Sequence, residues 1–328
     1  MATMKEVADL ANVSVATVSR VISSPDSVRK ETRERVLDAI SALHYQPNYL
    51  GRTLRLMKTK RILVILHTLS NQFFSRVMRG IEDRAREDHY SVLVSVTRGN
   101  AETFRDYARM LQTHEVDGCI ITSLDVPEAE LLKLSQEAPV VCACEPVKSR
   151  RIPVVSIDDE AAAYETVSFL ISKGKKKIAL FGAGDLYYSS SLRLKGALHA
   201  LRENGITPFY QSDEGYSFRS GSRALSAMLL AKAELPDAIF CFSDSCAIGT
   251  ISSLDSHGFK VPQDVSVIGF DNTAISEMFV PSLTTVAQPQ HAIGYKAADL
   301  LIRQIEGKPI EKKRYALQHE IILRDSMS

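Results

Sequence analysis

The chain has 328 residues, of which 45% are hydrophobic and 24% charged, and its formal net charge is +1. This composition is typical of globular proteins, and the length is enough for two or three domains. No apolar run approaches the roughly 18 residues of a membrane span, and the N-terminus lacks the pattern of a signal peptide. We therefore expect a cytoplasmic protein that does not enter a membrane.

The five cysteines agree with that expectation. Their number is odd, no C-x-x-C occurs, and most lie in apolar runs, as is typical of reduced, buried thiols. Cys142 and Cys144 have no His or further Cys at ligand spacing, so we expect no metal site.

Charge is unevenly distributed along the chain. Residues 1–60 hold ten Lys or Arg against six Asp or Glu, whereas the remaining residues hold thirty against thirty-three. A small basic segment on a near-neutral body is typical of a phosphate-binding domain, although many solvated helices are equally basic.

Residues 4–22, MKEVADLANVSVATVSRVI, predict two short helices joined by a tight turn. Thr3 and Glu6 have the spacing of a capping box at the start of the first helix. Ser14 is placed to N-cap the second helix, expected over 15–22. Small apolar residues on both helices would allow the close crossing of a helix-turn-helix.

A third helix is expected over residues 29–43, with apolar residues at helical spacing. Arg29 is a poor N-cap, so this helix either frays at its start or begins at Ser27. Pro47 is expected to end it.

The run V-A-x-x-A-x-V-S-x-A-T-V-S-R-V-I closely resembles the start of the lac repressor/galactose repressor family of bacterial transcription regulators, whose second helix lies in the DNA major groove. By this resemblance Arg20 reads a guanine or contacts a phosphate. Val15 and Ala16 occupy the positions that choose operators and suit thymine methyls, unless they are core residues. Ser14 and Thr17 either contact phosphate or cap the helix.

Residues 47–60, PNYLGRTLRLMKTK, resemble the hinge P-N-x-x-A-R-x-L of that family, which becomes a helix when paired with its twin on DNA. Asn48 and Arg52 match the motif. Leu54 matches the leucine that wedges between base pairs in the minor groove, or it packs on its own module. Gly51 replaces the usual alanine and lowers helix propensity by about 1 kcal/mol.

From Arg61 onward, apolar strands alternate with amphipathic helices, and the pattern repeats in the second half of the chain. Such alternation predicts an α/β fold with parallel sheets covered by helices. Two sheets give two lobes, and ligands bind at a crevice outside the strand ends. The core resembles the two-lobed, periplasmic-binding-protein-like core of the same family.

The motif P-x-L-T-T-V-x-Q-P at residues 281–289 marks, in that family, the return of the chain to the first lobe. The implied parts are a helix-turn-helix domain at 1–46, a hinge at 47–60, and a core at 61–328, with lobe one at about 61–159 and 287–318 and lobe two at about 160–286 and 319–328. The chain lacks the leucine heptad tail of the family's tetramers, so we expect a homodimer.

Two core residues are assigned to the effector by resemblance. SSSLRLKG resembles the stretch that supplies an effector-binding arginine, here Arg193, and GFDN supplies Asp271 at a strand end. An Arg and an Asp on opposite sides of a cleft can hold paired hydroxyls through charge-assisted hydrogen bonds. The alternatives are a surface salt bridge for Arg193 and a helix cap for Asp271.

Five more residues are candidates for the same pocket. Ser243 stands where relatives often have a polar ligand contact, and Tyr216 matches an aromatic position beside the ligand, with core packing as its alternative. Phe73 and Phe74 follow the first strand and are expected to wall the pocket. Glu145 ends the strand VVCACE and either accepts a ligand hydroxyl or base amide or lies in a solvated loop.

Two other features suggest an enzyme, but neither supports one. FGAGDLY has Tyr187 where G-x-G-x-x-G needs its third glycine. Asp158 and Asp159 have no nucleophile or metal set nearby in the sequence, so we interpret them as a strand end and a helix cap. Asp244, in FSDS, begins a helix and is expected to be its N-cap, with a ligand contact as the alternative.

The sequence therefore predicts a transcriptional regulator, most simply a repressor, without catalysis or cofactor. Its expected partners are a palindromic double-stranded DNA operator, a second copy of the chain, and a sugar, nucleoside or purine effector. SFRSGSRAL, VIGFDN and TTVAQP place it near the cytidine repressor branch of the family, although these runs recur in sugar-responsive relatives. The alternatives are a solute-binding protein and a nucleotide-dependent enzyme on the same α/β plan.

Overall fold

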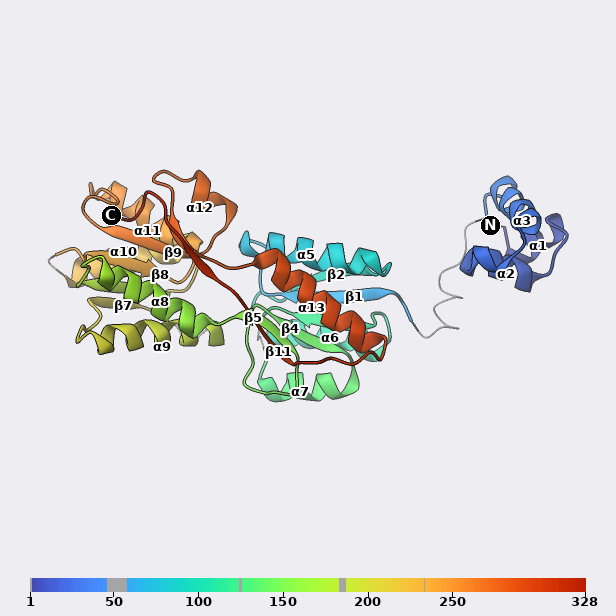
Figure 1. The fold of residues 1–328 in the computed structure, drawn as a ribbon, viewed down its shortest axis with the longest axis horizontal. Coiled ribbons are helices and arrows are strands. Elements are labelled where there is room, and N and C mark those ends of the chain that lie inside the picture. The colour runs from blue at the N-terminus through green and yellow to red at the C-terminus, as the bar shows by residue number, and fades with distance from the viewer. Residues whose placement is uncertain (1, 46–57, 124–125, 183–186, 233) are drawn as a thin grey trace. The chain divides into compact units, whose positions relative to one another are not determined.

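The computed structural model describes residues 2–45, 58–123, 126–182, 187–232 and 234–328. The chain divides into two compact units, Met1–Lys58 and Thr59–Ser328. The first is a small helical head and the second is an α/β core with two lobes (Figure 1).

The head contains α1 (Met4–Leu10), α2 (Val15–Ser23), the 3₁₀ turn η1 (Pro25–Ser27) and α3 (Lys30–Ala42). Each α-helix contributes a fully buried valine to one shared core; these are Val7, Val18 and Val36. A three-helix head built around so few apolar residues depends on well-formed helix ends.

Both predicted caps in the head are present. Thr3 Oγ1 accepts a hydrogen bond from the Glu6 N–H at 3.3 Å, and the Glu6 carboxylate accepts one from the Thr3 N–H at 2.7 Å. Ser14 Oγ accepts from the Thr17 N–H at 3.2 Å. Arg29 precedes α3 and makes no capping bond with its side chain, as its chemistry predicts.

The first lobe is a parallel sheet with strand order β11-β5-β4-β3-β1-β2. Its strands are β1 (Arg61–Leu66), β2 (Ser91–Val96), β3 (Gly118–Ile121), β4 (Val140–Ala143), β5 (Val154–Ile157) and β11 (Arg314–Leu317). Its helices are α5 (Phe73–Glu87), α6 (Ala101–Gln112), α7 (Glu128–Glu137) and α13 (Gln290–Ile305). Both faces of the sheet are buried, because Ile62 and Val64 belong to one apolar cluster and Leu63 and Ile65 to the other.

The second lobe has strand order β12-β10-β9-β8-β6-β7, parallel except for β12. Its strands are β6 (Ile178–Phe181), β7 (Tyr210–Ser212), β8 (Ala238–Cys241), β9 (Ser266–Asp271), β10 (Thr284–Ala287) and β12 (Glu320–Ile322). Its helices are α8 (Asp159–Ser172), α9 (Tyr188–Glu203), α10 (Phe218–Ala231), α11 (Asp244–Ser256) and α12 (Ala274–Met278). The sequence predicted no separate element at the positions of β7, α12, β10, α13 or β11.

The chain passes between the two sheets from β5 to α8, from β10 to α13 and from β11 to β12. Each sheet is therefore completed by residues from two distant parts of the sequence. In Figure 1 the red helix α13 lies beside the cyan helix α5 although about 200 residues separate them.

Glycines allow these helices to pack with their backbones in contact. A Cβ on Gly294 of α13 would lie 2.0 Å from the carbonyl oxygen of Val77 in α5, and one on Gly80 would lie 2.0 Å from that of His291. In the second lobe, Gly196 of α9 has the same relation to Glu160 of α8. No larger residue fits these crossings without moving a helix.

Candidate functional site

The second head helix, α2, presents the predicted DNA-reading residues to solvent. Val15 is 44% exposed, Ala16 and Arg20 are exposed, and Val18 and Val21 are buried on the opposite side. Val15 and Ala16 are therefore not core residues of the head. The exposed face combines two small apolar groups with one guanidinium, which is suited to thymine methyls and a guanine edge.

Ser14 and Thr17 act at the helix start. In addition to the capping bond, their hydroxyl oxygens lie 2.9 Å apart in a second hydrogen bond. The capping role predicted for Ser14 is therefore present, and the phosphate contact predicted for both residues stays a prediction. The hinge residues Asn48, Gly51, Arg52 and Leu54 lie outside the described residues, so their DNA contacts stay predictions.

Arg193, on α9, is the centre of a buried polar cluster between the lobes. Its Nε donates to Asp159 Oδ1 at 2.8 Å, and its Nη1 donates to the Phe242 carbonyl oxygen at 2.6 Å. The guanidinium lies 3.7 Å from the ring centroid of Phe270. The alternative predicted for Arg193 was a surface salt bridge. Arg193 does form a salt bridge, with Asp159, but it is buried: the two side chains are 6% and 1% exposed.

The charges of this cluster change one another's proton affinity. Burial lowers the pKa of Arg193, but Asp159, Tyr216 and Asp271 raise it, and it ends above its ordinary value. Burial raises the pKa of Asp159, and the Arg193 charge opposes that rise. Arg193 therefore stays charged, and Asp159 is its direct partner.

Glu145 follows β4 of the first lobe and hydrogen-bonds to the second. It is 5% exposed, and its two carboxylate oxygens accept from the Ser189 N–H at 2.9 Å and the Ser189 hydroxyl at 2.7 Å. Tyr187, the N-cap residue of α9, makes no capping bond with its side chain. The carboxylate from the other lobe therefore caps α9, so the solvated-loop alternative for Glu145 is wrong.

Burial raises the pKa of Glu145 to about 7, although both hydrogen bonds from Ser189 lower it. The neighbouring Asp159 raises this pKa further, and Arg193 lowers it. Desolvation exceeds the effect of two good hydrogen bonds here, because a carboxylate that loses water needs a full set of donors.

Asp271 ends β9 with φ of 119°, a backbone conformation that non-glycine residues rarely adopt. Its Oδ1 accepts from Gln288 Nε2 at 2.8 Å, and its carbonyl oxygen accepts from Gln290 Nε2 at 2.5 Å. Burial raises its pKa well above the ordinary value, while Arg193 lowers it. Asp271 caps no helix, so that alternative is wrong, and the strained geometry makes it a candidate functional residue.

The structure corrects the N-cap assignment at the start of α11. Ser243, not Asp244, is the N-cap: its Oγ accepts from the Cys246 N–H at 3.1 Å and donates to the Tyr216 carbonyl at 2.7 Å. Ser243 is 1% exposed and its hydroxyl caps α11, so it has a structural role, and the ligand contact predicted for it stays a prediction.

Asp244 is instead a fully buried carboxylate that connects the start of α11 to Thr273, which follows β9, and to Thr285 in β10. It accepts from the N–H and hydroxyl of Thr273 at 2.7 and 2.9 Å and from the Thr285 hydroxyl at 2.5 Å. Burial raises its pKa to about 6, and these hydrogen bonds lower it. Gly269 makes room for it, because a Cβ there would lie 2.5 Å from Asp244 Oδ1.

Aromatic rings lie beside the polar cluster. Tyr216 stacks on Tyr187 with ring centroids 5.6 Å apart, and the Tyr187 ring meets the edge of His67, from the first lobe, at 5.7 Å. Phe73 is 5% exposed and belongs to the first-lobe core, whereas Phe74 is only partly buried against it. Of the two phenylalanines, Phe74 is the better candidate for a pocket wall.

Sequence reasoning missed four members of the cluster: Asp159, Ser189, Gln288 and Gln290. Ser189 lies in the same SSSLRLKG stretch as Arg193, and both glutamines lie in or beside the T-T-V-x-Q-P motif. Asp159 was interpreted with Asp158 as a strand end and helix cap. Asp158 is that cap, accepting from the Ala161 N–H at 3.0 Å, and Asp159 points to Arg193 instead.

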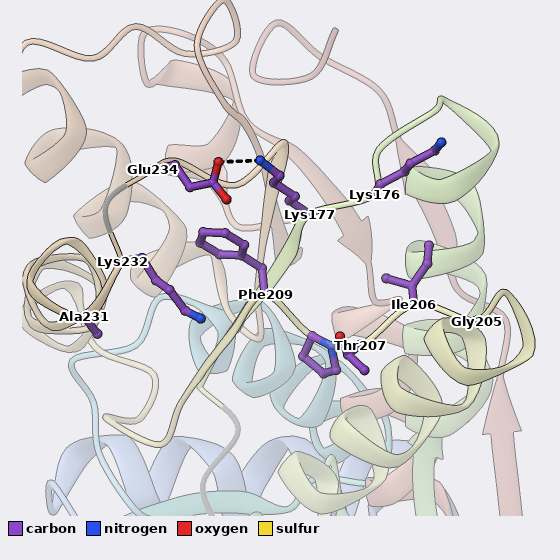
Figure 2. Close-up of a pocket in the computed structure, with 10 residues that line it drawn as sticks. Lys176, Lys177, Gly205, Ile206, Thr207, Phe209, Ala231, Lys232 and Glu234 are labelled. Carbon is purple, nitrogen blue, oxygen red and sulfur yellow. Dashed lines mark hydrogen bonds and ion pairs between the residues drawn. The ribbon is translucent and has the colours of Figure 1, made fainter.

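A separate surface cavity of about 700 Å³ opens at the amino ends of β6 and β7 (Figure 2). Lys177 Nζ pairs with Glu234 at 2.6 Å, and the Lys232 ammonium lies 5.3 Å from the Phe209 ring centroid. Its lysines, including Lys176, are solvent-exposed. The polar cluster lies at the opposite, carboxyl ends of the strands, where open α/β sheets bind ligands.

A helix-turn-helix head joined to a two-lobed α/β core with a buried polar cluster defines a DNA-binding, ligand-responsive regulator. A family model described as bacterial regulatory proteins, lacI family, matches residues 3–48, and a periplasmic binding protein-like domain matches residues 167–327. The repressor CytR of Escherichia coli (strain K12) is 35% identical over 99% of this chain and 96% of its own. The chain belongs to the lacI family of bacterial regulatory proteins.

Two further relatives cover the same length. Catabolite control protein A of Priestia megaterium is 36% identical over 99% of this chain and 98% of its own. The crystal structure of the lac repressor dimer bound to operator and the anti-inducer ONPF has a TM-score of 0.90 at 27% identity, covering 100% of this chain and 99% of that one. This chain is a DNA-binding repressor with a ligand-binding core and not an enzyme. In the described residues, no helix is long and apolar enough to cross a membrane.

Proposed function

We propose that the protein acts in the cytoplasm as a homodimeric repressor that binds a palindromic operator and is controlled by a small effector held between its lobes. The observation that carries the proposal is the cluster around Arg193, where both lobes contribute buried polar groups to one place. Because Glu145 and Ser189 hydrogen-bond between the lobes, a ligand bound among these groups can change how the lobes close.

On DNA, we propose that Arg20 reads a base and that Val15 and Ala16 contact thymine methyls. Ser14 and Thr17 position the helix against the phosphates, and the hinge residues Asn48, Arg52 and Leu54 act in the minor groove. A two-fold dimer places its recognition helices about one helical turn apart. Selection from random DNA is expected to yield adjoining inverted half-sites, and enrichment of direct repeats would contradict the dimer.

In the core, we propose that Arg193, Asp271, Glu145, Tyr216 and Phe74 surround the effector. Phe73 supports Phe74 from the core, and Ser243 serves the fold. The relatives' names support a small organic ligand: one solved relative is a complex of CelR with cellobiose, and another is the lac repressor with ONPF. A thermal-shift screen of sugars, nucleosides and purines tests this, since a ligand at 100 times its Kd adds about 2.7 kcal/mol of stability.

For the dimer, we propose a contact surface formed by α5 and the edge strand β2. A cavity of about 830 Å³ lies between them, lined in part by Met78, Val92 and Val94. Val94 is 45% exposed on an edge strand, and such edges are normally covered. Sedimentation velocity is expected to give a dimer for the native chain and monomer for Val94→Lys. Leu230→Lys, at a 90% exposed site on α10, is the control and should remain dimeric.

A further inference from the structure

The core unit begins at Thr59, and its first two residues are held by one carboxylate. Asp117, in the loop before β3, accepts at Oδ1 from the Thr59 N–H at 2.7 Å and from the Thr59 hydroxyl at 2.8 Å. Its Oδ2 accepts from the Lys60 N–H at 2.9 Å. The Asp117 N–H donates to the Arg61 carbonyl oxygen at 2.8 Å. One residue therefore binds three consecutive residues through its side chain and its backbone.

Lys60 makes further contacts with the first lobe. Its ammonium lies 4.1 Å from the ring centroid of Tyr90, donates to the Asp88 carbonyl oxygen at 3.3 Å, and lies 3.8 Å from the Glu306 carboxylate. Asp88 and Tyr90 precede β2, and Glu306 follows α13. The backbone of Lys60 has φ of 56°, which is uncommon for a residue other than glycine and persists only where the surroundings hold it. The start of the core is thus fixed to three separate parts of the first lobe.

The strand that follows does not depend on these contacts. β1 pairs with β2 along all six of its residues and with β3 from Ile62 to Ile65. Thr59 and Lys60 lie before that strand, and they are the last two residues of the predicted hinge at 47–60. Because β1 is held on both sides without them, the hydrogen bonds to Asp117 act on the segment that connects the core to the head.

We propose that Asp117 is a positioning residue for operator binding. It holds the core end of the hinge in one conformation, so that the two hinges of a dimer leave their cores in the same defined direction. This inference rests on the proposed function, because it assigns a residue of the core to the binding of a palindromic operator.

The physical reason is the freedom that the connection would otherwise have. A dimer gains affinity for a palindrome because its two heads bind at once, and that gain depends on how well the connections restrict the second head. Residues that are ordered in the free protein lose no further freedom on DNA, whereas two loose residues in each protomer would have to be ordered. Hydrogen bonds to a carboxylate are about twice as strong as neutral ones, which suits Asp117 to this role. One head on one half-site needs no such restriction.

The test compares two duplexes: the operator obtained by selection from random DNA, and the same duplex with one half-site scrambled. Fluorescence anisotropy of the full-length protein at fixed salt gives both affinities, with the dimer checked by sedimentation velocity. In Asp117→Asn one carboxylate oxygen becomes an amide nitrogen, which cannot accept from a backbone N–H. Its preference for the complete operator should fall about tenfold or more, while its affinity for the scrambled duplex stays near the native value. An unchanged preference overturns the inference, and so does an equal loss on both duplexes.

A second pair of variants acts on the other side of the same hydrogen bonds. Thr59→Val removes the hydroxyl that donates to Asp117, so the preference should fall about threefold, whereas Thr59→Ser keeps the hydroxyl and should match the native protein. This pair decides the question alone if Asp117→Asn does not fold, because equal preferences in the two Thr59 variants overturn the inference.

Glu137→Gln controls for the loss of a negative charge at this edge of the sheet. Glu137 is exposed, precedes β4 as Asp117 precedes β3, and accepts from Gln112 at 3.0 Å. Its variant should keep the native preference, and a fall equal to that of Asp117→Asn overturns the inference. A native protein without preference for the complete operator contradicts the proposed function, whereas a native preference that Asp117→Asn retains contradicts this inference alone.

Discussion

Glu145 is a single side chain that contributes to the structure of both lobes. Its carboxylate lies at the end of a first-lobe strand and satisfies an N-terminal N–H of a second-lobe helix. The helix gains a cap, and the carboxylate loses most of its water. This loss of water raises the pKa of Glu145 to about 7, so its charge changes in the neutral pH range.

We expect Glu145→Gln to increase stability at pH 8 more than at pH 5. The pKa of Glu145 is raised from 4.5 to about 7 in the folded protein, so the folded state holds a proton that the unfolded state releases between these values. The native free energy of unfolding therefore falls as pH rises through this window, and glutamine removes that loss. The gain at pH 8 should be about 1–3 kcal/mol.

Urea denaturation at both pH values measures this difference. Glu311→Gln, at an exposed site, is the control and should show no pH-dependent gain. A gain for Glu145→Gln that is equal at pH 5 and pH 8 would contradict the assigned proton linkage.

Arg20→Ala should weaken the preferred DNA site by about 1–3 kcal/mol and relax the preference at one base pair. The exposed guanidinium on α2 can make two hydrogen bonds to guanine, which alanine cannot replace. Arg33→Ala serves as control, because Arg33 lies on α3 and pairs with Asp26 at 3.1 Å. Affinity for specific and random sequences is compared at fixed salt. If Arg20→Ala lowers the affinity for the specific and the random sequence by the same factor, Arg20 contacts phosphate only.

For single residues, the sequence predicted the site residues that lie in recognisable motifs. It missed those whose role depends on which side chains they contact in the folded protein. Arg193 and Asp271 were found through motifs, and both belong to the cluster. Asp159 was missed because adjacent carboxylates at a helix start look alike, although one caps the helix and the other is buried. Asp244 was misassigned by one position, since Ser243 and Asp244 are both good N-caps.

Among the elements, α8 and α9 can pack closely because Gly196 has no side chain. Gly196→Ala should lower the free energy of unfolding by about 1–3 kcal/mol, because its methyl group would meet the Glu160 carbonyl and α8 and α9 would separate. Chemical denaturation of the two proteins measures the change. Lys195→Ala removes an exposed ion pair with Glu160 and should lower the free energy of unfolding much less than Gly196→Ala does. Equal effects of the two substitutions would exclude close packing as the cause.

The long, strongly patterned elements were predictable, and the short ones were not. Alternation of apolar runs with amphipathic segments predicted parallel sheets, because strands buried on both faces are continuously apolar. The three-residue strand β7, Tyr210–Ser212, has no such run, and its position depends on pairing with β6. β11 pairs with β5 across about 160 residues of sequence, a contact that local patterns cannot contain.

For the whole molecule, effector control should be separable from DNA binding. Asp271→Asn keeps an oxygen for the Gln288 amide but removes the buried charge, so operator affinity without effector should change less than twofold. The effector concentration needed for half its influence should rise at least tenfold, since a ligand acts only through its differential affinity for two states. Fluorescence anisotropy with labelled operator gives both values. Asp255→Asn, at an exposed residue of α11 that pairs with Lys260, is the control and should respond like the native protein. A native response in Asp271→Asn would place the effector elsewhere.

The order in which the lobes are completed has a consequence for how the chain is made. Strands β1 to β5 end at residue 157, but α13, which covers one face of their sheet, ends at residue 305. At a synthesis rate of about 5–20 residues per second, that helix emerges roughly 7–30 s later. During this interval Ile120, Val141 and Val155, on the three strands that α13 contacts, lack that helix, while the whole second-lobe segment up to β10 leaves the ribosome. The first lobe thus begins first and finishes late, and until α13 packs the nascent chain exposes apolar surface of the kind that chaperones bind.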